Sequence, residues 1–227
     1  MIKFAAIQMS SGGSVSANLE EAAKLIAQAV EQGANFVALP ENFAIQGKLE
    51  TDKLEVKEQP GEGPIHEFLS QQARQHGIWL CGGTMPMASD EEGRVFAASL
   101  IFNDQGDQVA RFDKIHLFDV ALDDGEEVYK ESETIKAGDE VVVVDSPYGK
   151  VGVAVCYDLR FPELFRQMVD QGAEIIFVPS AFTAVTGKAH WEPLLRARAI
   201  ENLVYIVAPN QAGYHLNGRA SHGHSMV

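Results

Sequence analysis

Short apolar stretches alternate with amphipathic stretches along the chain. The segment 18–33 carries apolar residues at intervals of three or four positions, which predicts a helix with one buried face. Asn18 and Glu21 match a capping box at its start, and Gly33 matches a C-terminal stop. The mostly apolar runs on either side, 2–8 and 35–40, predict strands.

The same alternation predicts further elements up to the end of the chain. Helices are expected at 65–76, at 162–172 with Pro162 in the first turn, and at 191–203 with Pro193 in the first turn. Strands are expected at 78–84, 141–144, 150–155, 174–179 and 204–210, and as a pair within 95–112 joined by a turn at 104–107. The pattern indicates a single α/β domain over residues 1–227, with helices outside sheets.

Residues 31–43 and 170–182 repeat one pattern: a helix end, a glycine, an apolar strand and a proline. Two interpretations stay open, because α/β units share such a pattern in general and because the chain could consist of two similar halves. Glu41 of the first copy is replaced by Ser180 in the second. The strand and its turn therefore do not themselves require an acid at this position.

The charge of the chain argues against two classes of partner. Lysine and arginine number 18 against 32 aspartates and glutamates, a formal charge of −14, which disfavours nucleic acids and anionic membranes. No apolar run reaches the roughly 20 residues of a membrane helix. Cys81 and Cys156 are too few for a disulfide framework, so we expect a reducing, cytoplasmic location.

Glu41, Lys114 and Cys156 each stand just after a predicted apolar strand. Ligands of α/β sheets bind beyond the carboxyl ends of strands, so three reactive groups in such positions indicate a site. Each residue also has an ordinary structural interpretation, as a core cysteine, a capping or surface glutamate and a surface lysine. Cys81 is interpreted as a core residue, because strand residues and two glycines flank it.

Three motifs together resemble the signature blocks of the nitrilase superfamily of carbon–nitrogen hydrolases: LPENF at Glu41, DKIHLFD at Lys114 and VCYDLRFPE at Cys156. Their order and separations are also similar to that family, and the resemblance covers the whole chain. It implies an α-β-β-α sandwich with Cys156 as nucleophile, Glu41 as general base and Lys114 as the cation facing the oxyanion. It also implies that Glu131 orients Lys114 or carries protons, with other acids in 125–133 as alternatives.

The implied reaction is amide hydrolysis through a thioester. A thiol is only partly ionised at neutral pH, so Glu41 is expected to accept the proton of Cys156 and return it to the leaving nitrogen. The backbone N–H of Tyr157 is expected to join Lys114 in stabilising the oxyanion. Ammonia is the expected leaving group, water activated by Glu41 completes the cycle, and no metal or organic cofactor is expected.

Other kinds of site fit less well. A cysteine–histidine protease needs a histidine base and a local sequence around the cysteine that this chain lacks. His215, His222 and His224 follow no strong zinc-binding spacing. A catalytically silent binding protein of the same fold is the non-enzymatic alternative, which the presence of Glu41, Lys114 and Cys156 together disfavours.

Within the superfamily, the chain most resembles the branch that hydrolyses deaminated glutathione and small ω-amides, through YDLRFPEL, SAFTAVTG and ASHGHSMV. The resemblance implies four substrate-binding residues, Tyr157, Arg160, Phe182 and Thr186. A guanidinium can hold a carboxylate bidentately, although Arg160 could instead pair with Asp158 or Glu163. We expect a small carboxylate-bearing amide as the substrate, with deaminated glutathione first, α-ketoglutaramate-type amides next, and nitriles or carbamoyl compounds as further alternatives.

The chain stops within a predicted strand, where members of the resembled family continue. We expect either a naturally short form or a sequence that lacks the C-terminal strands. The family resemblance also implies a homodimer or a higher even-numbered homo-oligomer built on a two-fold interface.

Overall fold

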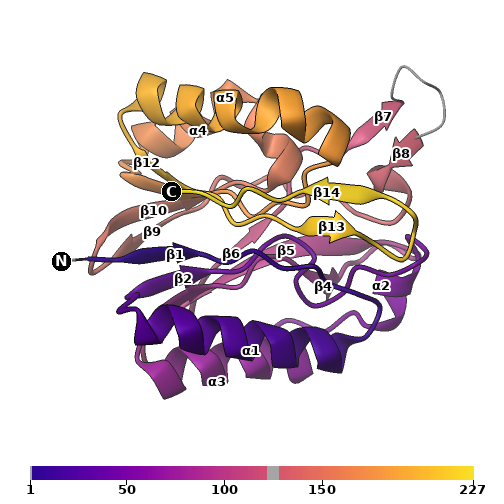
Figure 1. Cartoon of the computed structure of the whole chain (residues 1–227), viewed down its shortest axis with the longest axis horizontal. Coiled ribbons are helices and arrows are strands. Elements are labelled where there is room, and N and C mark those ends of the chain that lie inside the picture. The colour runs from indigo at the N-terminus through magenta and orange to yellow at the C-terminus, as the bar shows by residue number, and fades with distance from the viewer. Residues whose placement is uncertain (1, 122–127) are drawn as a thin grey trace.

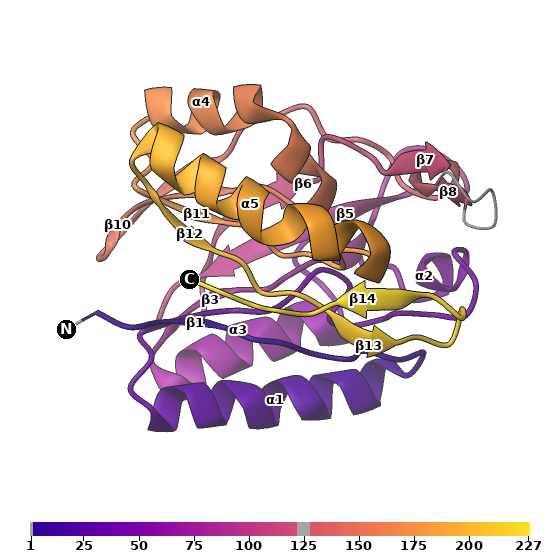
Figure 2. The same cartoon turned by 45° about the horizontal axis from the view of Figure 1, so that its top comes forward.

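The computed structural model describes residues 2–121 and 128–227. Two β-sheets pack face to face, with helices on both outer sides (Figure 1). Helices α1 (Val15–Glu31) and α3 (Pro64–His76) cover one sheet, and α4 (Pro162–Asp170) and α5 (Ala184–Asn202) cover the other (Figure 2). This is the helix–sheet–sheet–helix order that the sequence resemblance implies. The short elements are α2 (Asp52–Glu55), η1 (Glu131–Glu133) and η2 (Cys156–Arg160).

Each sheet contains three parallel strands extended by antiparallel ones. The first sheet has the order β1 (Phe4–Ala6), β2 (Phe36–Ala38), β3 (Trp79–Cys81), β5 (Val95–Phe102) and β4 (Met85–Ala88), and β6 (Gln108–Asp113) also pairs with β5. The second has the order β12 (Tyr205–Val207), β11 (Ile175–Phe177), β10 (Gly149–Val153) and β9 (Val143–Ser146). Two hairpins stand apart, β7 (Asp119–Ala121) with β8 (Val128–Lys130), and β13 (Ala212–Tyr214) with β14 (Ala220–His222).

The two copies of the repeated sequence pattern form β2 and β11, and each is the middle of three parallel strands. The rings of Phe36 and Phe177 meet between the sheets with their centroids 4.6 Å apart. This arrangement favours the interpretation of the chain as two similar halves.

Strand β2 shows why its residues are apolar on both sides. Phe36 and Ala38 belong to the core that includes strands of the second sheet, whereas Val37 and Leu39 belong to the core under α1 and α3. Successive side chains of a strand point to opposite faces, so a strand covered on both faces has no position for a solvated side chain.

Two predicted helix starts are wrong. Helix α1 is capped by Ser14, whose Oγ accepts a hydrogen bond from the N–H of Ala17. Asn18 lies inside the helix, where its side chain is buried and donates to the carbonyls of Gly12 and Ala44. Helix α5 begins at Ala184, so Pro193 lies in its interior rather than in its first turn.

Candidate active site

Glu41 is held in a tight turn just after β2. Asn42 has a φ of 56°, a left-handed conformation that asparagine tolerates better than most residues. Gly83 packs so closely that a Cβ there would lie 2.1 Å from the carbonyl oxygen of Pro40. The buried Gln211 donates from Nε2 to the carbonyl of Glu41 at 3.0 Å. These contacts direct a carboxylate that is only 4% exposed toward the interior.

Lys114 follows β6 and lies between two carboxylates. Its Nζ donates to Oε1 of Glu41 at 2.9 Å and to both carboxylate oxygens of Glu131 at 2.8 Å. Burial alone would lower the pKa of this ammonium, but the charges of Glu131, Glu41 and the Cys156 thiolate raise it well above its ordinary value. Lys114 is therefore a buried, permanently charged cation.

Glu131 is the first residue of η1. Its Oε2 also accepts the backbone N–H of Phe118 at 2.6 Å, so the carboxylate is held by both a side chain and the main chain. Glu133, one of the nearby alternatives, instead points to solvent beside Lys130. The alternatives at 126 and 127 lie outside the described residues.

Cys156 stands at the junction between β10 and η2. Its φ is 45°, in the left-handed region that non-glycine residues adopt at a cost, and its N–H donates to the carbonyl of Pro179 at 3.0 Å. Burial and the charge of Glu41 raise the pKa of this thiol well above its ordinary value, against the opposing effect of Lys114. The backbone N–H of Ala181 donates to Oε2 of Glu41 at 2.7 Å. The same N–H also acts as a hydrogen-bond donor to the Cys156 sulfur, which opposes the rise in the pKa of the thiol.

Cys81 is separate from this arrangement. It is fully buried in β3, its Sγ lies 3.6 Å from Oγ of Ser99, and burial raises its pKa to about 11. It is a core residue, as the sequence predicts.

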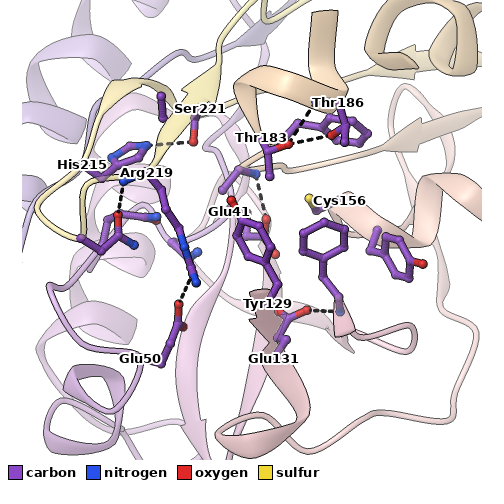
Figure 3. Close-up of a pocket in the computed structure, with 18 of the residues that line it drawn as sticks. Glu41, Glu50, Tyr129, Glu131, Cys156, Thr183, Thr186, His215, Arg219 and Ser221 are labelled. Atoms are coloured by element: carbon purple, nitrogen blue, oxygen red, sulfur yellow. Dashed lines mark hydrogen bonds and ion pairs between the residues drawn. The ribbon is translucent and has the colours of Figure 1, made fainter. Parts of the chain in front are cut away.

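A pocket opens over Cys156 (Figure 3). It is lined by Glu41, Lys114, Glu131 and Cys156, and also by all four residues that the resemblance assigns to substrate: Tyr157, Arg160, Phe182 and Thr186. Thr186 Oγ1 lies 2.7 Å from Oγ1 of Thr183, at the start of α5. The structure thus brings every predicted site residue to one cavity.

Arg160 is not part of the structural bridge that the sequence left open. Among the described residues, no carboxylate lies within ion-pair distance of its guanidinium, which contacts Nδ1 of His190 at 3.2 Å. The guanidinium carbon lies over the ring of Phe182 at 5.4 Å and over that of Tyr157 at 5.9 Å. Asp158 is turned away, toward His116 and the N–H of Val155.

One wall of the pocket was not predicted from the sequence as part of the site. It is formed by residues in and just before α2, in β8 and in the β13–β14 hairpin: Glu50, Lys53, Tyr129, His215, Arg219 and Ser221. The sequence pointed to this wall only through Arg219, a basic residue in the histidine-containing stretch 215–225. His215 Nε2 lies 2.8 Å from Oγ of Ser221, and the rings of His222 and His224 stack. In the part of the chain described, no three potential ligands are grouped to hold a metal ion.

The chain is similar to known enzymes along nearly its whole length. Residues 3–227 match the family described as carbon–nitrogen hydrolase. The chain is 44% identical over 226 residues to a deaminated glutathione amidase of Synechocystis, covering 98% of this chain and 82% of that protein. It is 40% identical over 210 residues to the omega-amidase NIT2-B of Xenopus laevis, covering 92% and 74%.

A solved structure shows the same fold. Saccharomyces cerevisiae Nit3, described as a member of branch 10 of the nitrilase superfamily, matches with a TM-score of 0.88 and 34% identity, covering 99% of this chain and 81% of that one.

Among the described residues, no helix has both the length and the apolar character needed to cross a membrane.

Proposed function

The chain belongs to the carbon–nitrogen hydrolase family and is an amidase of the nitrilase superfamily, and we propose that it hydrolyses a small carboxylate-bearing amide, deaminated glutathione first among them. The observation that carries the substrate class is Arg160, a guanidinium without a carboxylate partner among the described residues, in the same pocket as Cys156. A charged donor of this kind binds a substrate carboxylate strongly in a partly desolvated pocket.

The proposed reaction begins with proton transfer from the Cys156 thiol to Glu41. Sulfur then forms a bond to the amide carbon, and the oxyanion is stabilised by Lys114 and by a backbone N–H such as that of Tyr157. Glu41 returns the proton to nitrogen as the C–N bond breaks, which leaves a thioester. Water then loses a proton to Glu41 and attacks the thioester carbon. The C–S bond breaks, the carboxylic acid is released, and Glu41 returns the proton to the Cys156 sulfur.

The charges around Lys114 suit this role for Glu41. The Lys114 ammonium and the carboxylates of Glu41 and Glu131 together carry a net charge of −1. Protonation of Glu41 therefore makes this buried cluster neutral. Glu131 orients the ammonium through two hydrogen bonds and is itself held by the N–H of Phe118. A high pKa keeps Lys114 from acting as the acid, so Glu41 carries the proton.

The leaving amine depends on the substrate, which corrects the expectation of ammonia. Ammonia leaves from a primary amide such as α-ketoglutaramate. The corresponding amide of deaminated glutathione joins a 2-oxoglutaryl group to cysteinylglycine, so 2-oxoglutarate and the dipeptide are the products. The pocket extends from Cys156 to the β13–β14 hairpin, which provides room for a leaving group larger than ammonia.

The test is a direct comparison of three substrates. Deaminated glutathione, α-ketoglutaramate and a neutral aliphatic amide are assayed through their carboxylic acid products with wild type and Arg160→Ala. Deaminated glutathione should have the highest kcat/KM and should lose about 10- to 100-fold in the variant, as expected for a lost charged hydrogen bond. Preference for α-ketoglutaramate supports the omega-amidase alternative, whereas a preferred neutral amide with a harmless substitution contradicts the carboxylate class.

We further propose a homodimer, or a higher even-numbered oligomer, in the cytoplasm. Ile200, Leu203 and Tyr205, near the C-terminal end of α5, are 73%, 93% and 73% exposed and provide apolar surface for such an interface. A reducing compartment keeps the Cys156 thiol reactive. Sedimentation should show an even-numbered species that Leu203→Glu dissociates, and a monomeric wild type contradicts the assembly.

A further inference from the structure

The pocket carries an excess of positive charge in an acidic protein. Among the described residues, its lining includes five lysines and arginines, Lys53, Lys114, Lys130, Arg160 and Arg219, and three carboxylates, Glu41, Glu50 and Glu131. The whole chain has a formal charge of −14, so attraction for an anion must come from this local surface. Lys114 is already paired with Glu41 and Glu131, and Arg160 belongs to the proposed site for the acyl part.

Arg219 is the second guanidinium of the pocket and is held in place from three sides. Nη1 donates to Oε1 of Glu50 at 2.7 Å, and Nη2 donates to the carbonyl of Val128 at 2.9 Å. The guanidinium carbon lies 4.0 Å from the centre of the Tyr129 ring. These bonds use two of the five N–H donors of the group, and its side chain is 28% exposed. An anion can therefore reach a preorganised donor.

Glu50 does not cancel this positive charge. Its carboxylate is shared with Lys53, whose Nζ lies 3.1 Å from Oε2. These three described residues, one carboxylate between two cations, together carry a net charge of +1.

The position of Glu41 indicates which part of a substrate lies near Arg219. Glu41 must reach the leaving nitrogen to return its proton, so the amine lies on the Glu41 side of the scissile carbon. In the view of Figure 3, Glu41 lies between Cys156 and Arg219. Arg160 is on the Cys156 side, four residues further along the chain and packed on Tyr157 and Phe182. The two guanidiniums thus contact different aromatic rings at different walls of one pocket.

We propose that Arg219 is a specificity-determining residue that binds an anionic group on the leaving amine, such as the carboxylate of a dipeptide. The proposal rests on the proposed amidase function and divides the pocket into an acyl part at Arg160 and an amine part at Arg219. It explains how one pocket prefers a 2-oxoglutaryl dipeptide to a primary amide. Ammonia, the leaving group of a primary amide, has no group that can reach Arg219.

The experiment compares substrates that differ only in the amine. Wild type and Arg219→Gln are assayed, through 2-oxoglutarate formation, with deaminated glutathione, with its C-terminal carboxamide, and with α-ketoglutaramate. Arg219→Gln should raise KM for deaminated glutathione by about 10- to 100-fold, the range for a hydrogen bond to a charged group. The carboxamide should have an equally high KM with both enzymes. The KM for α-ketoglutaramate should be the same in the wild type and in Arg219→Gln.

A matched control separates this effect from a general loss of charge. Arg94 is also paired with a glutamate, at 2.8 Å, but it does not line the pocket. Arg94→Gln should therefore leave the KM for all three substrates unchanged. Equal effects of Arg219→Gln on deaminated glutathione and α-ketoglutaramate overturn the proposal while the amidase function stands. No turnover of any substrate by the wild-type enzyme overturns the proposed function itself, and this inference with it.

Discussion

Asp158 accepts two hydrogen bonds from His116 through Oδ1, from the backbone N–H at 2.8 Å and from Nδ1 at 2.6 Å. Asp158 lies two residues after Cys156, and His116 lies two residues after Lys114. Oδ2 of Asp158 accepts the N–H of Val155 at 2.8 Å, and the His116 ring stacks on Phe161 with centroids 3.6 Å apart. A fully buried carboxylate therefore joins the segment of the cation to the segment of the nucleophile.

The first prediction concerns this connection. Asp158→Asn keeps the shape but places an amide where the carboxylate accepts three hydrogen bonds, so the free energy of unfolding should fall by about 1–3 kcal/mol. Because Asp158 positions the site and contacts no substrate, kcat should fall while KM changes little. Urea unfolding and steady-state kinetics measure the two effects. A variant with unchanged stability and kcat shows that the connection has no positioning role.

The second prediction concerns the backbone at Cys156. Both Cys156→Ala and Cys156→Gly should abolish turnover, whereas Cys81→Ala should retain most of it. The φ of 45° disfavours every residue that has a Cβ, so the glycine variant should be more stable than the alanine variant by about 1 kcal/mol. Urea unfolding measures this difference in the free energy of unfolding when both variants show the same dependence on urea concentration. If alanine proves the more stable, position 156 is not strained; turnover by either variant contradicts the nucleophile.

The third prediction compares two ways of disrupting the buried charges. Lys114→Met leaves Glu41 and Glu131 without a cation and should cost about 3–5 kcal/mol of stability. Glu41→Gln leaves Lys114 bonded to both oxygens of Glu131, so its cost should be clearly smaller. Both variants should lose orders of magnitude in kcat, because the residues act as a unit with the thiol. Equal stability costs would show that Glu131 does not compensate the lysine.

The fourth prediction concerns pH. The raised pKa of Cys156 means that its thiol is neutral at neutral pH, so iodoacetamide should react slowly there. The alkylation rate should rise about tenfold for each pH unit between about pH 7 and about pH 9, as the thiolate fraction does below the pKa. Cys81, which is fully buried, should remain unlabelled in the folded protein and serves as the internal control. A plateau of the Cys156 rate below this range contradicts the raised pKa.

The sequence predicted most helices and strands because their apolar periodicity is local information. The start of α1 was misplaced because Asn18 is used for tertiary contacts with Gly12 and Ala44, which no local pattern reveals. The first part of α5 was missed because it contains Gly187. A Cβ at that glycine would lie 2.4 Å from His222, so the residue is required by packing against β14 rather than by helix propensity.

The candidate site also contains residues that local sequence predicts and residues that it does not. Glu41, Lys114 and Cys156 each follow an apolar strand and stand in recognisable motifs, so they were available from the sequence. The wall with Glu50 and Arg219 was not, because these residues are far apart in the chain and meet only through the hairpin. The backbone N–H of Ala181 that reaches Glu41 carries no side-chain signal at all.

The central claim is that Cys156 carries the acyl group of an amide substrate. The most direct measurement is rapid acid quenching of the enzyme with excess deaminated glutathione, followed by mass spectrometry of the intact chain and its peptides. The account predicts a hydroxylamine-sensitive 2-oxoglutaryl adduct on the peptide that contains Cys156, formed together with cysteinylglycine and absent in Cys156→Ala. Turnover of the same substrate by Cys156→Ala, or an acyl group found on any other residue, would contradict it.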